Sequence, residues 1–154
     1  MTELVEGQKR PLYRKILIAT DGSAQTKKAV EHAIELARLM SAKLYIVYVV
    51  DNIAFASIPL DMKSESMYEA LHKEGLDATN SVADAASEKG VDAETVVLEG
   101  NPAEEIVDFA KNNEIGLIVL GMLGKSGLER FLLGSVAEKV ARASPVPVMI
   151  VRGA

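Results

Sequence analysis

The sequence contains no cysteine, which excludes disulfide bonds and thiolate-ligated metal sites. It also lacks long apolar runs. The longest runs, near residues 44–50 and 116–123, are far shorter than the roughly 20 residues of a transmembrane helix. Residues 1–15 contain no apolar segment of signal-peptide length. These absences favour a cytoplasmic protein without a membrane partner.

Several motifs of catalysis and nucleotide binding are missing as well. No G-x-G-x-x-G occurs, and a Walker loop ending at Gly124-Lys125-Ser126 would need glycine at position 119, which is Val119. No G-x-S-x-G occurs, which argues against a Ser–His–Asp hydrolase. The two histidines, His32 and His72, lie far apart in the sequence and there is no cysteine, so zinc is not expected. We therefore assign no catalytic residue and no side-chain metal ligand.

Length and charge set further limits. The 154 residues are 49% hydrophobic and 25% charged, as expected for one globular domain. The net charge of −5, from 17 basic and 22 acidic residues, argues against nucleic acid as a general partner.

Apolar runs alternate with helical patterns along the chain. Strands are expected near residues 15–20, 43–50, 93–98, 117–120 and 146–151, and helices near 24–40, 63–89, 102–112 and 135–144. Gly75 weakens the middle of the long second helix and allows a bend or a break there. Five strands alternating with four helices predict an α/β domain, a parallel sheet with helices on both faces. Pro145 and Pro147 place the final strand at a sheet edge.

The stretch from Leu117 to Val140 carries the clearest functional signal. A buried strand is followed by Gly121, Gly124, Gly127, Gly134 and Ser135, after which the pattern becomes helical. Glycines let a ligand approach the main chain, and a helix N-terminus attracts anions. The stretch therefore indicates a phosphate-binding loop. The alternative is an ordinary strand-to-helix turn, in which Ser135-x-x-Glu138 is a capping box.

Two other strands end in candidate site residues. Asp21 follows the first strand and Asp51 the second, while Gly121 follows the fourth. Ligands of parallel sheets bind at the carboxyl ends of strands, where the strand order reverses. If the first and fourth strands are neighbours there, all three residues lie at one edge.

Three segments together resemble the universal stress protein family, and within it the branch that binds ATP. They are Ala19-Thr20-Asp21-Gly22-Ser23, Val49-Val50-Asp51 and Gly121-x2-Gly124-x9-Gly134-Ser135. The similarity covers the chain from about Tyr13 to Arg152. It implies a Rossmann-like sheet in the order 3-2-1-4-5, formed by residues 13–154 after a flexible arm of residues 1–12. It also implies a homodimer, a role in stress response or signalling, and bound ATP or another adenine nucleotide with Mg2+ or Mn2+ held through its phosphates.

The same resemblance assigns roles to individual residues. Asp21 would bond the ribose or adenine side of the nucleotide, and the main chain of Val49 would meet the adenine edge. The remaining expected ligand contacts are the wall residues Ala19 and Thr20, the nucleoside-pocket residues Leu120 and Gly121, and the phosphate contacts Gly124, Gly134, Ser135 and Val136.

This chain departs from the family pattern at three places. Met122 and Leu123 stand where a small hydroxyl residue and a polar or basic one are common, and Ala19 stands where proline is frequent. A cradle built from the main chain does not depend on these side chains. The loop cations Lys125 and Arg130 are expected to be solvated rather than bound to phosphate.

Three functions remain open from the sequence. The first is a nucleotide-dependent signalling protein with little or no turnover, and the second is a slow ATP hydrolase. The third is a dimeric interaction module that holds no nucleotide. In each case the apolar edge strand Val148–Val151 is expected to pair with a second copy, since a bare apolar edge promotes aggregation.

Overall fold

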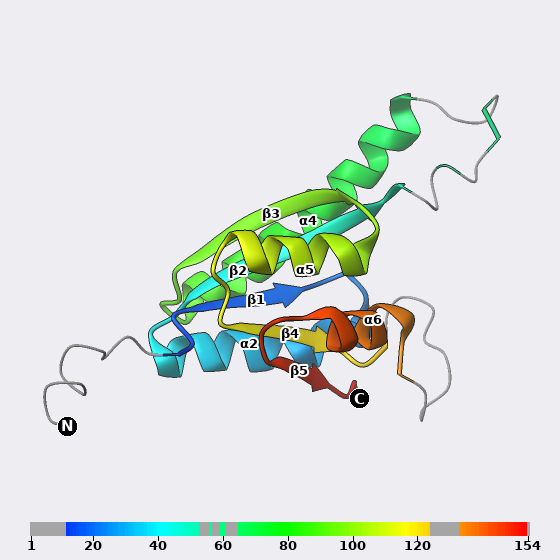
Figure 1. Cartoon of the computed structure of the whole chain (residues 1–154). Coiled ribbons are helices and arrows are strands. Elements are labelled where there is room, and N and C mark those ends of the chain that lie inside the picture. The colour runs from blue at the N-terminus through cyan, green and yellow to red at the C-terminus, as the bar shows by residue number, and fades with distance from the viewer. Residues whose placement is uncertain (1–11, 53–55, 57–58, 61–64, 124–132, 154) are drawn as a thin grey trace, which may run out of the picture.

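A five-stranded parallel sheet forms the centre of the molecule (Figure 1), with the strands in the order β3-β2-β1-β4-β5. The computed structural model describes residues 12–52, 56, 59–60, 65–123 and 133–153. The strands are β1 (Lys15–Ala19), β2 (Lys43–Asp51), β3 (Ala93–Gly100), β4 (Leu117–Gly121) and β5 (Val148–Val151). The predicted fold class and strand order are confirmed.

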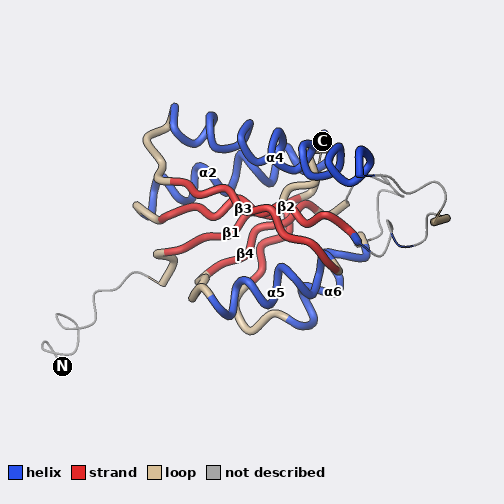
Figure 2. Tube along the Cα trace, turned by 90° about the horizontal axis from the view of Figure 1, so that it is seen from above, coloured by secondary structure: helices blue, strands red, loops and turns tan. Residues whose placement is uncertain are grey.

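Helices cover both faces of the sheet, as Figure 2 shows. They are the 3-10 turn η1 (Ala24–Thr26) and the helices α2 (Lys27–Met40), α4 (Glu65–Glu88), α5 (Pro102–Asn112) and α6 (Ser135–Ala143). Helices α2 and α4 lie on one face, and α5 and α6 lie on the other. Within the described ranges, no helix is long and apolar enough to cross a membrane.

Side chains of the central strands alternate between two apolar layers. In β1, Ile16 and Ile18 pack with α2 and α4, whereas Leu17 packs with α5 and α6. All three are fully buried. Burial on both faces explains why the strand reads as a continuous apolar run rather than an alternating one.

Gly75 allows a close approach rather than a break. Helix α4 continues through it as one element. A Cβ atom at this position would lie 2.8 Å from Tyr48 Cδ1 and 3.2 Å from Val97 Cγ1. The absence of a side chain therefore lets α4 lie against β2 and β3, so the break allowed by the sequence is not present.

Other expectations need smaller corrections. Met40, the last residue of the helix expected near residues 24–40, is 39% exposed because it lies at the end of α2, next to the left-handed Ser41. The final strand begins at Val148, two residues later than predicted. Proline has no N–H to donate to a ladder, and Pro147 joins β4 only through its carbonyl, which accepts from Ile118 N (3.0 Å). The helix expected from residue 102 is confirmed as α5, and the Asn101 side chain caps it by accepting from Glu104 N (3.2 Å).

Candidate functional site

The candidate site lies at the carboxyl edge of the sheet, where β1 and β4 are neighbours. These two strands pair in parallel as far as Ile18 and Val119, and their chains leave the sheet at Ala19 and Gly121. From here the chain turns toward opposite faces, to α2 after β1 and to α6 after β4 (Figure 2). The strand order implied by the family resemblance reverses here, and the pairing of β1 with β4 confirms it.

Strand β2 extends past the end of β1 and forms one side of this edge. The β1–β2 ladder ends at Ala19 and Val47, while β2 and β3 stay paired to Asp51 and Gly100. Lys43 N donates toward β1, to Arg14 O (2.9 Å), and Leu44 N donates toward β3, to Asp92 O (2.8 Å). Because main-chain groups alternate in direction along a strand, those of Val49 point to the β1 side, beyond its last residue. The N–H donor and the C=O acceptor of Val49 therefore point together into the space beyond the end of β1.

The Asp21 side chain is held by the turn that follows β1. Its Oδ1 accepts from Ser23 N (2.9 Å) and from the Ser23 hydroxyl (2.5 Å), and the Thr26 hydroxyl lies 3.4 Å away. Gly22 has a φ of +78°, which the turn requires, and a Cβ there would lie 3.3 Å from Ala78 Cβ in α4. Glycine is therefore suited to this position both by conformation and by space.

Thr20 faces inward at this edge. Its side chain is 7% exposed, its hydroxyl accepts from Gly22 N (3.1 Å), and it lies 3.3 Å from the Thr26 hydroxyl. The hydroxyl therefore supports the turn, and the main-chain N–H of Thr20 donates to Val47 O (2.9 Å). Neighbouring Ala19 is half-buried.

The glycine-rich loop starts and ends with main-chain hydrogen bonds. Met122 N donates to Val151 O (2.9 Å), and Gly134 N donates to Met122 O (2.8 Å). The second bond joins the beginning of the loop to its end. A Cβ on Gly121 would meet Leu123 O at 3.3 Å and the Thr26 methyl at 3.4 Å, so this glycine permits tight packing against the β1 loop. Leu120, just before it, is 3% exposed.

The first turn of α6 presents unpaired main-chain donors. Gly134 is the N-cap, and its carbonyl accepts the first helical bond from Glu138 N (2.9 Å). Among the described residues, the N–H groups of Ser135, Val136 and Ala137 have no main-chain acceptor. The capping-box alternative for Ser135 is wrong, because Ser135 is the first residue of the helix and its exposed hydroxyl does not cap it.

Most of the predicted site residues are thus at one edge, carried by four segments. These are Ala19 at the end of β1 with Thr20 and Asp21 after it, Val49 in β2, Leu120 and Gly121 in β4, and Gly134, Ser135 and Val136 before and in α6. Gly124, Lys125 and Arg130 lie outside the described residues. Ser23 follows β1 in a segment whose residues favour turns and helix caps, and its contact with Asp21 was not predicted. Its place two residues after an aspartate is the signal that was available.

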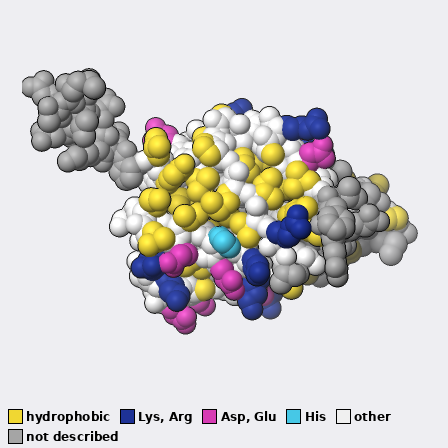
Figure 3. All heavy atoms as spheres, turned by 90° about the horizontal axis from the view of Figure 1, so that it is seen from below, with side chains coloured by type: hydrophobic (Ala, Val, Ile, Leu, Met, Phe, Trp, Pro, Cys, Tyr) yellow, Lys and Arg dark blue, Asp and Glu magenta, His cyan; other side chains and the backbone are white. Residues whose placement is uncertain are grey.

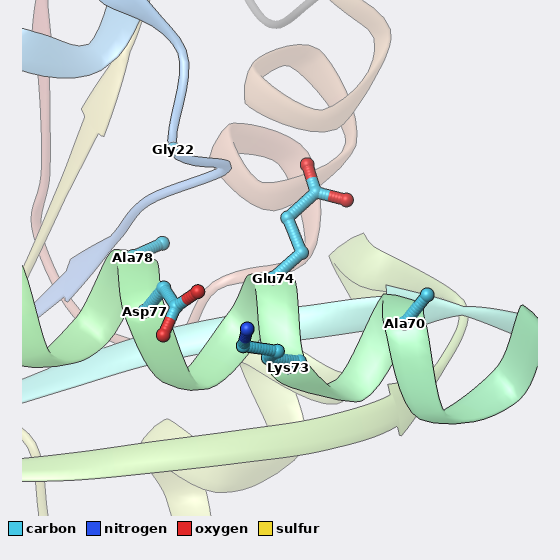
Figure 4. Close-up of a pocket in the computed structure, with 6 residues that line it drawn as sticks. All are labelled: Gly22, Ala70, Lys73, Glu74, Asp77 and Ala78. Carbon is cyan, nitrogen blue, oxygen red and sulfur yellow. The ribbon is translucent and has the colours of Figure 1, made fainter. Parts of the chain in front are cut away.

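A separate groove of about 410 Å3 lies beside the Asp21 turn (Figure 4). It is lined by Gly22 and by the α4 residues Ala70, Lys73, Glu74, Asp77 and Ala78, none of them a predicted ligand contact. The two carboxylates outnumber the one ammonium group, so the groove disfavours phosphate. Within the described part of the chain, no three acidic or histidine side chains gather to hold a metal ion.

The sequence and the fold both match known proteins. The model of the universal stress protein family matches residues 12–152. A universal stress protein of Methanocaldococcus jannaschii, MJ0531, is 46% identical over 141 residues, which cover 92% of this chain and 83% of that protein.

Among solved structures, that of the hypothetical protein MJ0577 is similar with a TM-score of 0.81 and 28% identity, covering 92% of this chain and 96% of that one. A universal stress protein in complex with cAMP gives a TM-score of 0.65 at 29% identity, covering 91% and 97% of the two chains. A universal stress protein from Archaeoglobus fulgidus in complex with dAMP gives a TM-score of 0.65 at 28% identity, covering 92% of this chain and 100% of that one. The protein described by these 154 residues belongs to the universal stress protein family.

Proposed function

We propose that this protein binds an adenine nucleotide, with ATP as the expected ligand, at the carboxyl edge of β1 and β4. One observation carries the proposal: a carboxylate, a main-chain donor–acceptor pair and a helix N-terminus meet at this edge. They come from Asp21, Val49 and α6. The complexes of family members with cAMP and dAMP support an adenine nucleotide in particular.

Each group suits a different part of the ligand. The N–H and C=O of Val49 match the acceptor and donor on the edge of adenine, and the Asp21 carboxylate suits a hydroxyl or amino donor of the nucleoside. Ala19 and the Thr20 main chain line the wall beside it, and Leu120 and Gly121 form the floor. The bare N–H groups of Ser135 and Val136, with the Ser135 hydroxyl, would hold the phosphates.

Gly134 was expected to donate its N–H to a phosphate, and we now propose a different role for it. Its N–H is already bonded to Met122 O, so the donors we assign are the three N–H groups that follow, including that of Ala137. Gly134 then acts by closing the loop and by capping α6. Gly124 remains a proposed phosphate contact through its main chain.

A divalent cation is expected here as a partner of the phosphates, because the described residues offer no cluster of side-chain ligands. We propose that Mg2+ or Mn2+ is held by phosphate oxygens rather than by a cage of side chains. Bound in this way, the cation would neutralise phosphate charge. The N-terminus of α6 would add its partial positive charge on the same side.

Little or no turnover is the expected behaviour. Hydrolysis needs a group that positions water and a charge that stabilises the γ-phosphate. The acidic residue in the first turn of α6 is Glu138, and its carboxylate is paired with Arg142 (2.9 Å) rather than placed to position a water molecule. We therefore propose a nucleotide-dependent protein of stress response or signalling, acting in the cytoplasm. A slow ATP hydrolase is the second candidate.

We propose that the protein is a homodimer paired through β5. Val148, Met149 and Ile150 are half-buried along this edge strand. Figure 3 views the molecule from the side on which β5 lies and shows an apolar band bordered by charged side chains. The opposite edge strand, β3, carries exposed Glu94 and Glu99 instead. Charges on an edge oppose pairing, so β5 is the edge suited to a second copy.

The test begins with freshly purified protein. Denaturation and chromatography identify any released nucleotide, and the stripped protein is then titrated with Mg-ATP by calorimetry. We expect about one ATP per chain, and loss of binding in Asp21→Ala and Gly134→Val. Asp77→Ala, which removes an aspartate from the α4 groove, is the matched control and should bind normally.

The outcomes separate the three functions. Binding without phosphate release supports the signalling protein, and release by the purified protein alone supports the hydrolase. No bound nucleotide and no heat, with the fold intact, would favour the interaction module. Normal binding by Asp21→Ala and Gly134→Val would contradict the site.

A further inference from the structure

Ser23 has an unusual role for a residue at its position. It is the N-cap of η1, where a serine hydroxyl commonly accepts a bond from the helix, yet no side-chain cap forms. Its hydroxyl instead donates to Asp21 Oδ1 at 2.5 Å, and its main-chain N–H donates to the same oxygen at 2.9 Å. A hydroxyl-to-carboxylate bond of this length is of the strong, charge-assisted kind.

The buried threonines Thr20 and Thr26 lie next to the turn of residues 21–23, and the Thr26 hydroxyl contacts it. Thr20 and Thr26 are 7% and 6% exposed. The Thr26 hydroxyl lies 3.1 Å from Ser23 O and 3.4 Å from Asp21 Oδ1, and it has one proton to give, so the shorter contact with Ser23 O is favoured. Thr26 therefore fixes the Ser23 main chain, and Ser23 fixes the carboxylate.

The result is a carboxylate whose two oxygens differ. Every hydrogen bond that the described residues donate to Asp21 goes to Oδ1. Oδ2 is left as an acceptor on a half-buried side chain at the edge of the sheet. An ionised carboxylate accepts hydrogen bonds and repels phosphate, so Oδ2 suits a neutral donor of the ligand.

We propose that Ser23 is a positioning residue, which turns Oδ1 of Asp21 toward the protein so that Oδ2 accepts a hydrogen bond from the nucleoside. This inference rests on the proposed nucleotide binding at the same edge. The donor is a ribose hydroxyl or the adenine amino group. Ser23 acts only through Asp21 and does not touch the ligand.

The test combines variants with ligands that lack one donor. Calorimetry compares Mg-ATP with Mg-2′,3′-dideoxy-ATP, which has no ribose hydroxyl, and with Mg-ITP, which has no adenine amino group. The wild-type protein should bind at least one of the two analogues about tenfold or more weakly than ATP, since bonds to charged groups are strong. ITP also loses the amino group that we assign to Val49 C=O, so the donor to Asp21 is identified by the analogue whose disadvantage against ATP disappears in Ser23→Ala.

Ser23→Ala removes the hydroxyl and should weaken ATP binding about tenfold while leaving the affinity for that analogue nearly unchanged. Ser23→Thr keeps the hydroxyl, and the extended backbone of residue 23 (φ −81°, ψ 160°) accepts a threonine, so discrimination should return. Thermal melts confirm that the variants are folded.

Three results would overturn the inference. Ser23→Ala could bind ATP as the wild type does, or it could lose equal affinity for ATP and both analogues, which would mean only a damaged turn. The wild type could also bind both analogues as tightly as ATP, so that Asp21 takes no nucleoside donor. If the wild type binds no nucleotide at all, the proposed function fails first.

Discussion

Replacing Gly75 with alanine sets helix propensity against packing. Propensity alone predicts a gain of about 1 kcal/mol for Gly→Ala within a helix. The added Cβ would lie 2.8 Å from Tyr48 Cδ1 and 3.2 Å from Val97 Cγ1. Overpacking of this kind costs about 1–3 kcal/mol. The upper part of that range applies, because Tyr48 is only 5% exposed and its ring cannot swing away.

We therefore expect Gly75→Ala to lower the free energy of unfolding by about 1–2 kcal/mol. Urea unfolding followed by circular dichroism measures it, at a fixed protein concentration because the proposed dimerisation would add to stability. Ser81→Ala, at an exposed position of the same helix, is the control and should be neutral or slightly stabilising. A Gly75→Ala protein more stable than the wild type would refute the packing argument.

Three further changes are expected to act in distinct ways. Gly22→Ala should destabilise the fold by about 1–2 kcal/mol, since residue 22 has a φ of +78° and lies against Ala78; an unchanged thermal midpoint would contradict this. Asn101→Ala should cost about 1 kcal/mol in urea unfolding by removing the α5 cap while Mg-ATP affinity stays the same. Ile150→Lys should turn the proposed dimer into a monomer in sedimentation experiments, whereas Thr95→Lys on the opposite edge strand should not.

The strands of the sheet could be predicted from the sequence because a strand that is buried on both faces is apolar at every position. Residues 117–120 read as an unbroken apolar run, and all four are buried in β4. The start of α5 was equally clear, because Asn101 and Pro102 are a cap and a first-turn residue whose preferences are local. Alternation of strands and helices then led to the parallel fold.

Contacts between distant segments could not be predicted in the same way. From the local sequence, Gly75 is a weak point in a helix. Its contribution to packing depends on Tyr48 in β2 and Val97 in β3, which are distant in the sequence. The capping-box pattern at Ser135 was misleading because the loop closes through Gly134, whose N–H reaches Met122 O. The sequence indicated residues that lie at this edge, and their role in binding stays a prediction; the hydrogen bonds that orient them could not be predicted.

The most direct test of the central claim is an amide nuclear magnetic resonance titration of the labelled protein with Mg-ATP. Binding at the proposed edge predicts the largest shifts at Val49 and at Ser135 to Ala137, the main-chain groups that face the ligand. Shifts centred on Lys73 and Asp77 in the α4 groove, or no shifts at saturating ATP, would contradict the account.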